Sequence, residues 1–339
     1  MVRTIPERLL SLTLALACLA SVPPAEAASH TSLSSGVQHV ELLVEPDDGL
    51  GAITRAIRRA NSSIRLTMYI LTDHSVIRAL EFAHAVGVDV RVILEPHPYG
   101  SSSSTNLYAY NNLLAADIPV RWSSARYALT HEKSMLIDST TAYIMTTNFT
   151  RAAFRANREF DVIDRDRREA DALSALFAAD WAGRPYTPAD PNLVTSPTNA
   201  RATLAALIAS ARRALDLYAE ELQDGGMVQA LAAAARRHVR VRLLLPAPSG
   251  PDPDGPSVAA VAAAGVAVHR LAQSQLYIHA KAIVVDGERA FVGSQNLSSA
   301  SLDRNRELGV LLSDRRAVAK LEQTFAEDWR RPAAIALPK

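Results

Sequence analysis

The stretch that decides the fold runs from Tyr277 to Asn296 and reads YIHAKAIVVDGERAFVGSQN. A histidine and a lysine, His279 and Lys281, stand two positions apart just before a run of apolar residues. Residues two apart in a β-strand point to the same face, so this pair projects together while the apolar run buries the strand. The segment predicts a rigid strand that presents two polar side chains at one end.

The same order of polar residues occurs earlier in the chain, between Thr130 and Asn148. A constant offset of 148 positions relates the two segments without a gap, and it holds as far as Trp181, which falls on Trp329. Upstream the similarity continues with small shifts, since VDVRVIL from Val88 matches VRVRLLL from Val239. The chain is therefore predicted to be a duplicated α/β unit.

Each copy shows the same succession of an amphipathic helix, a short apolar strand, a second helix and a β-branched strand that ends at a proline. The expected helices are at about 50–62, 74–86, 199–213 and 226–237, and the expected apolar strands are at 64–70 and 215–218. Loops of unusual composition follow, from His97 and from Ala247. Loops after strand ends are where open α/β sheets bind ligands, so we expect both to overhang the site.

The first 27 residues are typical of a secretory signal peptide. Two arginines precede an apolar stretch over 9–22, and small residues follow at 25–27. We expect cleavage between Ala27 and Ala28 and hence a secreted or periplasmic protein. Lipid attachment at Cys18 is less favoured, because Ala15 stands where a bacterial lipoprotein signal usually has leucine.

The rest of the chain is predicted to form two lobes, over 28–190 and 191–339, with a linker that begins at Pro188. A chain of 339 residues that is 48% hydrophobic can build globular cores of this size. Its formal net charge of +1 argues mildly against binding long nucleic acid through many phosphate contacts. Of its 36 basic residues only four are lysines, and two of these, Lys133 and Lys281, lie in the repeated segments.

Polar residues persist at equivalent positions of the two copies although their apolar neighbours differ, and this persistence marks the candidate site. Asp138 and Asp286 fit hairpin turns, so we expect them to support the motif rather than to take part in chemistry. The candidate catalytic residues are His131, Lys133, Asn148, Glu159, His279, Lys281, Asn296 and Glu307. The candidate supporting residues are Asp138, Thr146, Asp286, Gly293 and Ser294.

Two histidines, two lysines and two asparagines that meet at a lobe interface suit attack on a phosphodiester. One neutral imidazole attacks phosphorus, the other protonates the departing oxygen, and lysine and asparagine stabilise the charged oxygens. An unperturbed pKa of about 6.5 lets one ring be neutral and the other cationic. Glu159 and Glu307 would each hold a ring through its other nitrogen. We expect neither a metal nor a cofactor, since the mature chain has no cysteine and no paired carboxylate cluster adjoins either motif.

From His279 to Asn296 the chain matches HxKx4Dx6GSxN, the signature of the phospholipase D superfamily, which it resembles over about residues 40–332. The resemblance implies two similar lobes, each with a mixed β-sheet flanked by helices, and an active site on the pseudo-two-fold axis between them. It implies a phosphohistidine intermediate formed without a metal. It also implies that His131 is the nucleophile and that His279 is the acid.

The first copy departs from this pattern at Met145 and Thr146, where the second copy has Gly293 and Ser294. The hydroxyl is kept, whereas a bulky side chain replaces glycine. We expect the methionine to narrow the pocket on its side, which leaves open which histidine attacks.

The favoured function is that of a secreted phospholipase D that hydrolyses the distal phosphodiester bond of glycerophospholipids at a membrane surface. Loops with Tyr99, Tyr108 and Tyr110 but no lysine or arginine suit a lipid interface. The alternatives are a secreted nuclease of the same superfamily, acting on DNA or RNA, and, less favoured, a non-catalytic phosphate-binding protein. A cardiolipin synthase is disfavoured because the membrane-spanning helices typical of that branch are lacking. Oligomerisation is not required, because both motifs lie on one chain.

Overall fold

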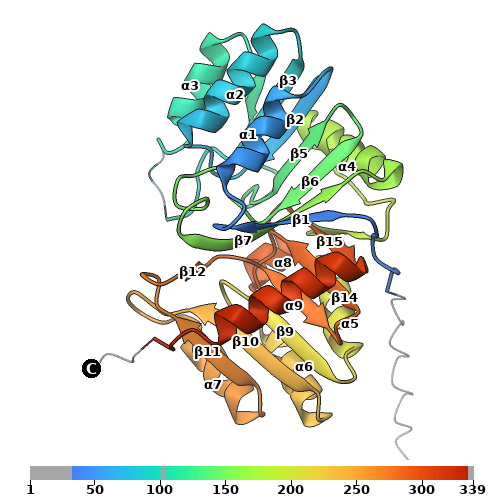
Figure 1. Ribbon diagram of the computed structural model, residues 1–339, viewed down its shortest axis with the longest axis vertical. Coiled ribbons are helices and arrows are strands. Elements are labelled where there is room, and N and C mark those ends of the chain that lie inside the picture. The colour runs from blue at the N-terminus through green and yellow to red at the C-terminus, as the bar shows by residue number, and fades with distance from the viewer. Residues whose placement is uncertain (1–32, 101, 103, 335–339) are drawn as a thin grey trace, which may run out of the picture. The chain divides into compact units, whose positions relative to one another are not determined.

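The computed structural model describes residues 33–100, 102 and 104–334. The predicted signal peptide, its cleavage site and Cys18 lie outside the described residues. Within that part of the chain the strands form two mixed β-sheets with the same order of equivalent strands (Figure 1). The duplicated α/β fold that the sequence predicts is confirmed.

The first sheet has the order β1-β7-β6-β5-β2-β3-β4. Strands β2, β3 and β4 run parallel, and the other neighbours pair antiparallel. The bounds are β1 (Glu41–Glu45), β2 (Ser63–Met68), β3 (Asp89–Leu94), β4 (Val120–Trp122), β5 (Lys133–Ile137), β6 (Thr141–Met145) and β7 (Asn157–Asp164).

The second sheet repeats this arrangement in the order β8-β15-β14-β13-β9-β10-β11. A further strand, β12 (Tyr277–Ile278), comes from the second half of the chain but pairs with β7 of the first sheet. The bounds are β8 (Leu193–Ser196), β9 (Ala214–Tyr218), β10 (Arg240–Pro246), β11 (Ala267–Leu271), β13 (Ala282–Val285), β14 (Arg289–Gly293) and β15 (Glu307–Leu312).

Helices cover both faces of each sheet. In the first lobe α1 (Leu50–Arg58), α2 (His74–Ala85) and α3 (Leu107–Ala115) pack on one face, and α4 (Arg167–Trp181) packs on the other. In the second lobe the equivalents are α5 (Ala200–Ala209), α6 (Gly225–Arg236), α7 (Gly255–Ala263) and α9 (Arg315–Trp329), with a short α8 (Ser299–Asp303) after the second motif. Four of these helices begin after an aspartate whose side chain accepts a backbone N–H of the first turn. These aspartates are Asp73, Asp166, Asp224 and Asp314.

Two segments predicted to be irregular contain regular structure. The loop from His97 includes α3, because Ala109 and Leu113, four positions apart, are buried against the neighbouring helix and strands. The linker from Pro188 includes β8, which completes the second sheet beside β15. In both cases tertiary packing orders a segment whose composition is typical of loops.

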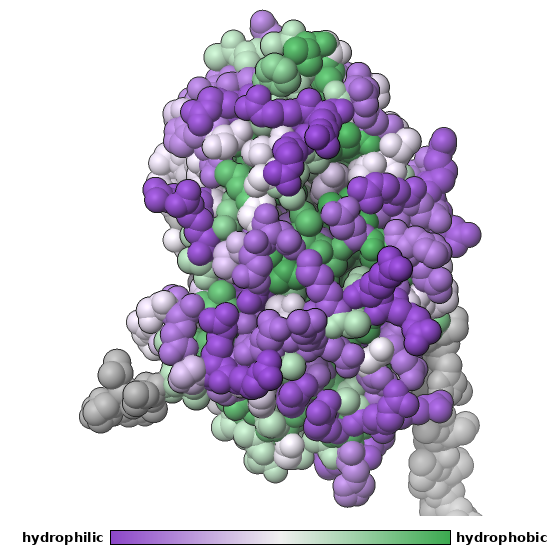
Figure 2. All heavy atoms as spheres, viewed as in Figure 1, coloured by the Kyte–Doolittle hydropathy of each residue, from purple (hydrophilic) through white to green (hydrophobic). Residues whose placement is uncertain are grey.

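One hydrophobic cluster joins the two lobes. It contains Leu173 and Leu176 from α4, Leu321 and Phe325 from α9, and apolar side chains from the facing sides of both sheets. Separate clusters lie beneath the helices on the outer face of each sheet. On the face shown in Figure 2, hydrophilic side chains predominate and apolar residues emerge between them in scattered areas. Because the first of these clusters spans both lobes, the lobes share a core rather than meeting through a polar surface.

Two buried ion pairs cross between the lobes reciprocally. Arg158 of β7 donates to Asp328 of α9 at 2.7 and 3.0 Å. Arg306, just before β15, donates to Asp180 of α4 at 3.0 Å. Both arginines are almost fully buried. Because the same offset relates both arginines and both aspartates, the persistence of these residues in the repeat has a structural explanation.

We expect Asp328→Asn to lower the free energy of unfolding by about 3 kcal/mol, because among the described residues the buried guanidinium of Arg158 then keeps only the exposed Asp47 as a charged partner. The matched control is Asp171→Asn, which breaks an exposed pair with Arg167 and should change stability by less than about 1 kcal/mol. Urea unfolding followed by circular dichroism measures both. Equal effects of the two substitutions would contradict the structural role of the crossing pair.

Candidate active site

The backbone around each motif histidine is hydrogen-bonded to the backbone of the opposite lobe. The N–H of His131 donates to the carbonyl of Arg306 at 2.8 Å, and the N–H of Ala280 donates to the carbonyl of Arg158 at 2.9 Å. The strand pairing of β12 with β7 extends the second contact. Each histidine is thereby brought beside the glutamate that follows the arginine in the other lobe.

The two histidines exchange carboxylate partners between the lobes. Nδ1 of His131 donates to Glu307 at 2.8 Å, and Nδ1 of His279 contacts Glu159 at 2.7 Å. Both glutamates are fully buried. The repeat in the sequence shows that the two glutamates occupy equivalent positions. It does not show that each glutamate binds the histidine of the other copy.

Each carboxylate is itself held by its own lobe. Glu159 accepts from Thr146 Oγ1 at 2.7 Å and from Asn157 Nδ2 at 3.3 Å. Glu307 accepts from Ser301 Oγ at 2.6 Å and from Asn305 Nδ2 at 3.2 Å. With Nδ1 engaged in this way, the Nε2 atom of each ring is left for the cavity that both histidines line.

The two motif lysines have different surroundings. Lys133 Nζ donates to the carbonyl of His131 at 2.5 Å and lies 4.9 Å from the centre of the Tyr69 ring. Lys281 donates to the carbonyl of His279 and to Glu220 Oε2, the latter at 2.7 Å. Burial lowers the pKa of Lys133 to about 7, although the charge of Glu307 acts in the opposite direction.

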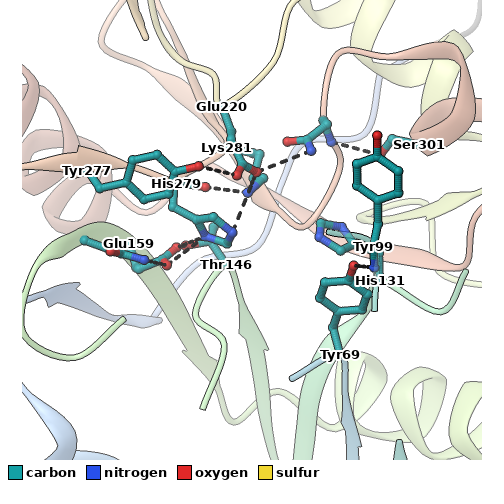
Figure 3. Close-up of polar contacts among 12 residues, drawn as sticks. Tyr69, Tyr99, His131, Thr146, Glu159, Glu220, Tyr277, His279, Lys281 and Ser301 are labelled. Carbon is teal, nitrogen blue, oxygen red and sulfur yellow. Dashed lines mark hydrogen bonds and ion pairs between the residues drawn. The ribbon is translucent and has the colours of Figure 1, made fainter. Parts of the chain in front are cut away.

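The surroundings of His131 favour its neutral form. Burial lowers the pKa of this imidazole, and the charges of Lys133 and Lys281 act in the same direction, whereas Glu307 raises it. Figure 3 shows His131 beside Tyr69 and Tyr99, the first of which meets it edge-on with ring centres 4.5 Å apart. A neutral ring with a free Nε2 has the lone pair that a nucleophile or base requires.

The two motif aspartates form turns. The pairs Asp138–Ser139 and Asp286–Gly287 all have positive φ, from 53° to 69°. With the residue that follows, each pair makes a three-residue hairpin loop, in which the N–H of residue 140 or 288 donates to the carbonyl of residue 137 or 285. The turns therefore join β5 to β6 and β13 to β14 at the ends of these strands remote from the histidines.

The carboxylates of the same aspartates bind backbone. Asp138 accepts from the N–H groups of residues 61–63, and Asp286 accepts from those of residues 212–214. Burial alone would raise the pKa of Asp138, but these hydrogen bonds lower it to about 2. Neither side chain lines the cavity.

Met145 does not narrow the pocket, contrary to the expectation from the sequence. Its side chain is fully buried in the cluster beneath α1 and α2, because strand alternation turns it away from the face that carries Thr146. Glycine is required in the second copy for a local reason. A Cβ on Gly293 would lie only 2.5 Å from the Cα of Gly309 and 2.7 Å from the ring of Phe291.

The histidines open into a cavity of about 670 Å³ to which both lobes contribute. Of the loop tyrosines only Tyr99 lines it, whereas Tyr108 packs against His74 and Tyr110 stacks on Trp122. The lining comprises Tyr69, Ile70, Tyr99, Leu129, His131, Asn148, Glu220, Glu221, Gln223, Pro253, His279, Asn296, Ser298, Ser299, Ala300, Ser301, Arg304, Asn305 and Glu307. The structure thus brings the histidines and asparagines of both motifs to one cavity. The lysines do not line the cavity, but each donates to the backbone carbonyl of the histidine in its own motif.

Glu220 is a site residue that motif reasoning missed. Its Oε2 accepts from Lys281 at 2.7 Å and from Asn296 Nδ2 at 3.3 Å, and it lies 3.6 Å from Nε2 of His279. Its Oε1 accepts from the Tyr277 hydroxyl at 2.9 Å (Figure 3). The residue lies outside the repeated motif. The one signal in the sequence is that two successive glutamates follow closely on an apolar strand, at the strand end where ligands bind.

A family model described as "Cardiolipin synthase, PLD-like domain" matches the chain twice, over residues 53–181 and 204–329. The chain belongs to the phospholipase D-like family. Each matched range contains one of the two motifs. Among the described residues, no helix is long and apolar enough to span a bilayer, and no group of three or more His, Cys, Asp and Glu side chains is arranged to hold a metal ion.

Curated relatives carry the same family name. A cardiolipin synthase from Listeria monocytogenes is 25% identical over 333 residues, which cover 85% of this chain and 68% of the relative. Cardiolipin synthase A from Pseudomonas putida is 30% identical over 142 residues, which cover 40% of this chain and only 28% of the relative. The chain therefore corresponds to only part of the length of these proteins.

Solved structures show the same fold. Phosphatidylserine synthase from Haemophilus influenzae superposes with a TM-score of 0.67 at 12% identity, over 89% of this chain and 88% of that one. Polyphosphate kinase from Porphyromonas gingivalis gives a TM-score of 0.68 at 20% identity, over 88% of this chain and 52% of that one. At these identities the likeness concerns the fold alone.

The exchange of carboxylates predicts a crossed response in solution. We expect Glu307→Gln to shift the ring resonances of His131 and to lower its pKa further, since it removes the charge that raises it. We expect Glu159→Gln to shift the ring of His279 instead. Nitrogen-15 NMR of labelled histidine rings measures both. Perturbation of the histidine in the same copy as the substituted glutamate would contradict the exchanged pairing.

Proposed function

We propose that this protein is a phosphodiesterase of the phospholipase D type that acts on glycerophospholipids through a phosphohistidine intermediate. The observation that carries the proposal is the pair of imidazoles from opposite lobes, each held at Nδ1 and each lining one cavity. The asparagines of both motifs line the same cavity, and the amide N–H of Asn148 can donate there to a phosphoryl oxygen.

His131 is assigned as the nucleophile and His279 as the acid. The lowered pKa of His131 keeps its Nε2 lone pair available to attack phosphorus. Glu220, 3.6 Å from Nε2 of His279, would repel a phosphate that approached this ring for attack, whereas no carboxylate oxygen of the described residues lies as close to Nε2 of His131. This asymmetry supports the order of roles that the family resemblance implies.

The reaction then takes two steps. His131 Nε2 forms a bond to phosphorus while the bond to the head-group alcohol breaks, and the proton of His279 passes to the departing oxygen. Neutral His279 next takes a proton from water, whose oxygen attacks the phosphohistidine and releases the lipid phosphate and free His131. The lysines offset the charge of the phosphoryl group in both steps.

Three observations support a phospholipid substrate. The relatives in sequence are named cardiolipin synthases. The chain has a net charge of only +1. Tyr99, which is 86% exposed, stands at the cavity and has the amphipathic ring that suits a lipid interface. Export by an amino-terminal signal, proposed from the sequence, would bring such an enzyme to membrane lipid outside the cytoplasm.

Transfer to an alcohol is a second candidate, because an alcohol can take the place of water in attacking the phosphohistidine. The names of the relatives favour it. They also weaken the argument from membrane helices, by which the sequence disfavours a cardiolipin synthase.

The test is to offer purified protein mixed phospholipid vesicles and supercoiled plasmid side by side, with and without added glycerol. We expect release of head-group alcohol and formation of phosphatidic acid from the vesicles, with the plasmid intact. Glycerol-dependent formation of a new phosphatidyl ester would identify transfer. Nicked plasmid with untouched vesicles would refute the phospholipid proposal in favour of a nuclease.

We expect His131→Ala and His279→Ala each to lower turnover by about 10²-fold or more, since each removes the nucleophile or the acid. Quenching with alkaline detergent, in which the bond between phosphorus and nitrogen survives, should trap labelled phosphoprotein from phosphorus-labelled substrate with His279→Ala but not with His131→Ala. The control is His84→Ala, on α2 and away from the cavity, which should leave turnover unchanged. A phosphoprotein formed by His131→Ala would overturn the assignment of the nucleophile.

A further inference from the structure

The two walls of the active-site cavity differ in charge. Strand pairing aligns β2 with β9, because Ile64 pairs with Ile137 as Leu215 pairs with the equivalent Val285. Counted on from this register, Tyr69 and Ile70 of the first lobe occupy the positions equivalent to Glu220 and Glu221 of the second. All four residues line the cavity. The two copies therefore share their motif residues but differ at these two positions. The first copy has an aromatic and an aliphatic side chain where the second has two carboxylates.

The carboxylates give the cavity an unfavourable charge balance for a simple phosphate. Glu159, Glu307, Glu220 and Glu221 all line or adjoin it, against the two motif lysines, Arg304 and the protonated His279 of the proposed mechanism, so no positive charge is left over for the substrate. Burial and the charge of Glu220 raise the pKa of Glu221 to about 6, which still leaves it mostly ionised at neutral pH. A phosphodiester adds one more negative charge. A substrate that brings its own cation restores the balance.

Asn296 supplies an independent indication of a donor-bearing ligand. The residue is 8% exposed, lines the cavity, and has an Oδ1 atom without a hydrogen-bond partner among the described residues. The equivalent Asn148 shares these features, but among the described residues no hydrogen bond holds its side-chain amide in one orientation. Because Nδ2 of Asn296 donates to Glu220, the orientation of this amide is fixed and its oxygen is left free to accept. A buried acceptor of this kind is costly unless a ligand donates to it.

We propose that Glu220, Glu221 and Asn296 form a subsite for the ammonium group of an amino-alcohol head group. The inference rests on the proposed function and names the alcohol half of its substrate. In an amino alcohol such as ethanolamine, two carbon atoms separate the reacting oxygen from the nitrogen. With that oxygen at Nε2 of His279, the ammonium falls beside the Glu220 carboxylate, 3.6 Å from Nε2.

The contacts of Glu220 fit this role. Tyr277 and Lys281 fix its two oxygens at 2.9 and 2.7 Å, so the carboxylate is held in place before the substrate arrives. Its side chain remains 18% exposed, so it is accessible from the cavity. The phosphoryl group is then left to the first lobe, where no carboxylate of the described residues accepts a hydrogen bond from Lys133 or Asn148.

The experiment compares kcat/KM on vesicles of phosphatidylethanolamine and of phosphatidylglycerol, which has an uncharged head group, each diluted in the same inert lipid. We expect the full-length protein to prefer phosphatidylethanolamine by about tenfold or more, the usual effect of a hydrogen bond to a charged group. The double variant Glu220→Gln, Glu221→Gln should lose most of this ratio, whatever it does to the absolute rates. Glu288→Gln, an exposed glutamate at the β13–β14 turn, is the control and should keep the ratio.

The outcomes separate this inference from the proposal beneath it. If neither lipid is turned over but plasmid is nicked, the phospholipid function fails and the subsite fails with it. If phosphatidylglycerol is turned over as fast as phosphatidylethanolamine, or if the double variant keeps the wild-type ratio, the ammonium subsite is refuted while the phospholipid function stands. Thermal unfolding of each variant shows whether a loss of ratio accompanies an intact fold.

Discussion

The structure depends on a reciprocal exchange between two copies of one unit. Each copy presents a histidine whose Nδ1 is held by a carboxylate of the other copy, and each copy sends an arginine to an aspartate of the other. Both sets of contacts are buried, so they fix the relative position of the lobes and the orientation of the rings at the same time. In each half, Nδ1 of the motif histidine depends on a glutamate of the other half.

The sequence predicted the equivalences but not the contacts. A constant offset reveals that His131 corresponds to His279 and Glu159 to Glu307, and the family motif supplies the fold. An offset cannot tell whether equivalent residues touch within a copy or between copies, because that depends on packing between distant segments. Met145 was misjudged for a related reason, since its direction depends on strand alternation. Glu220 has no counterpart of the same type in the first copy, so the search for repeats passed over it.

Tyr69 and Glu220 occupy equivalent positions, and the difference between them makes the surroundings of the two motif histidines unlike. The scaffold alone does not fix the substrate, since similar folds occur in a phosphatidylserine synthase and in a polyphosphate kinase. The walls of the cavity are better candidates for that role. One wall carries aromatic and aliphatic side chains, and the other carries carboxylates and hydroxyls. An almost symmetric frame thus encloses an asymmetric site, as a reaction with two unlike histidines requires.

The hydrophobic cluster between the sheets has a consequence for motion. Side chains of α4 and α9 fill the space that a hinge between the lobes would have to open, and close packing resists such rearrangement. Rigid-body closure, by which many two-lobed proteins capture their ligands, is therefore costly here. A catalytic cycle that leaves this packing intact also leaves the spacing of the catalytic groups intact, because each histidine is tied to the opposite lobe.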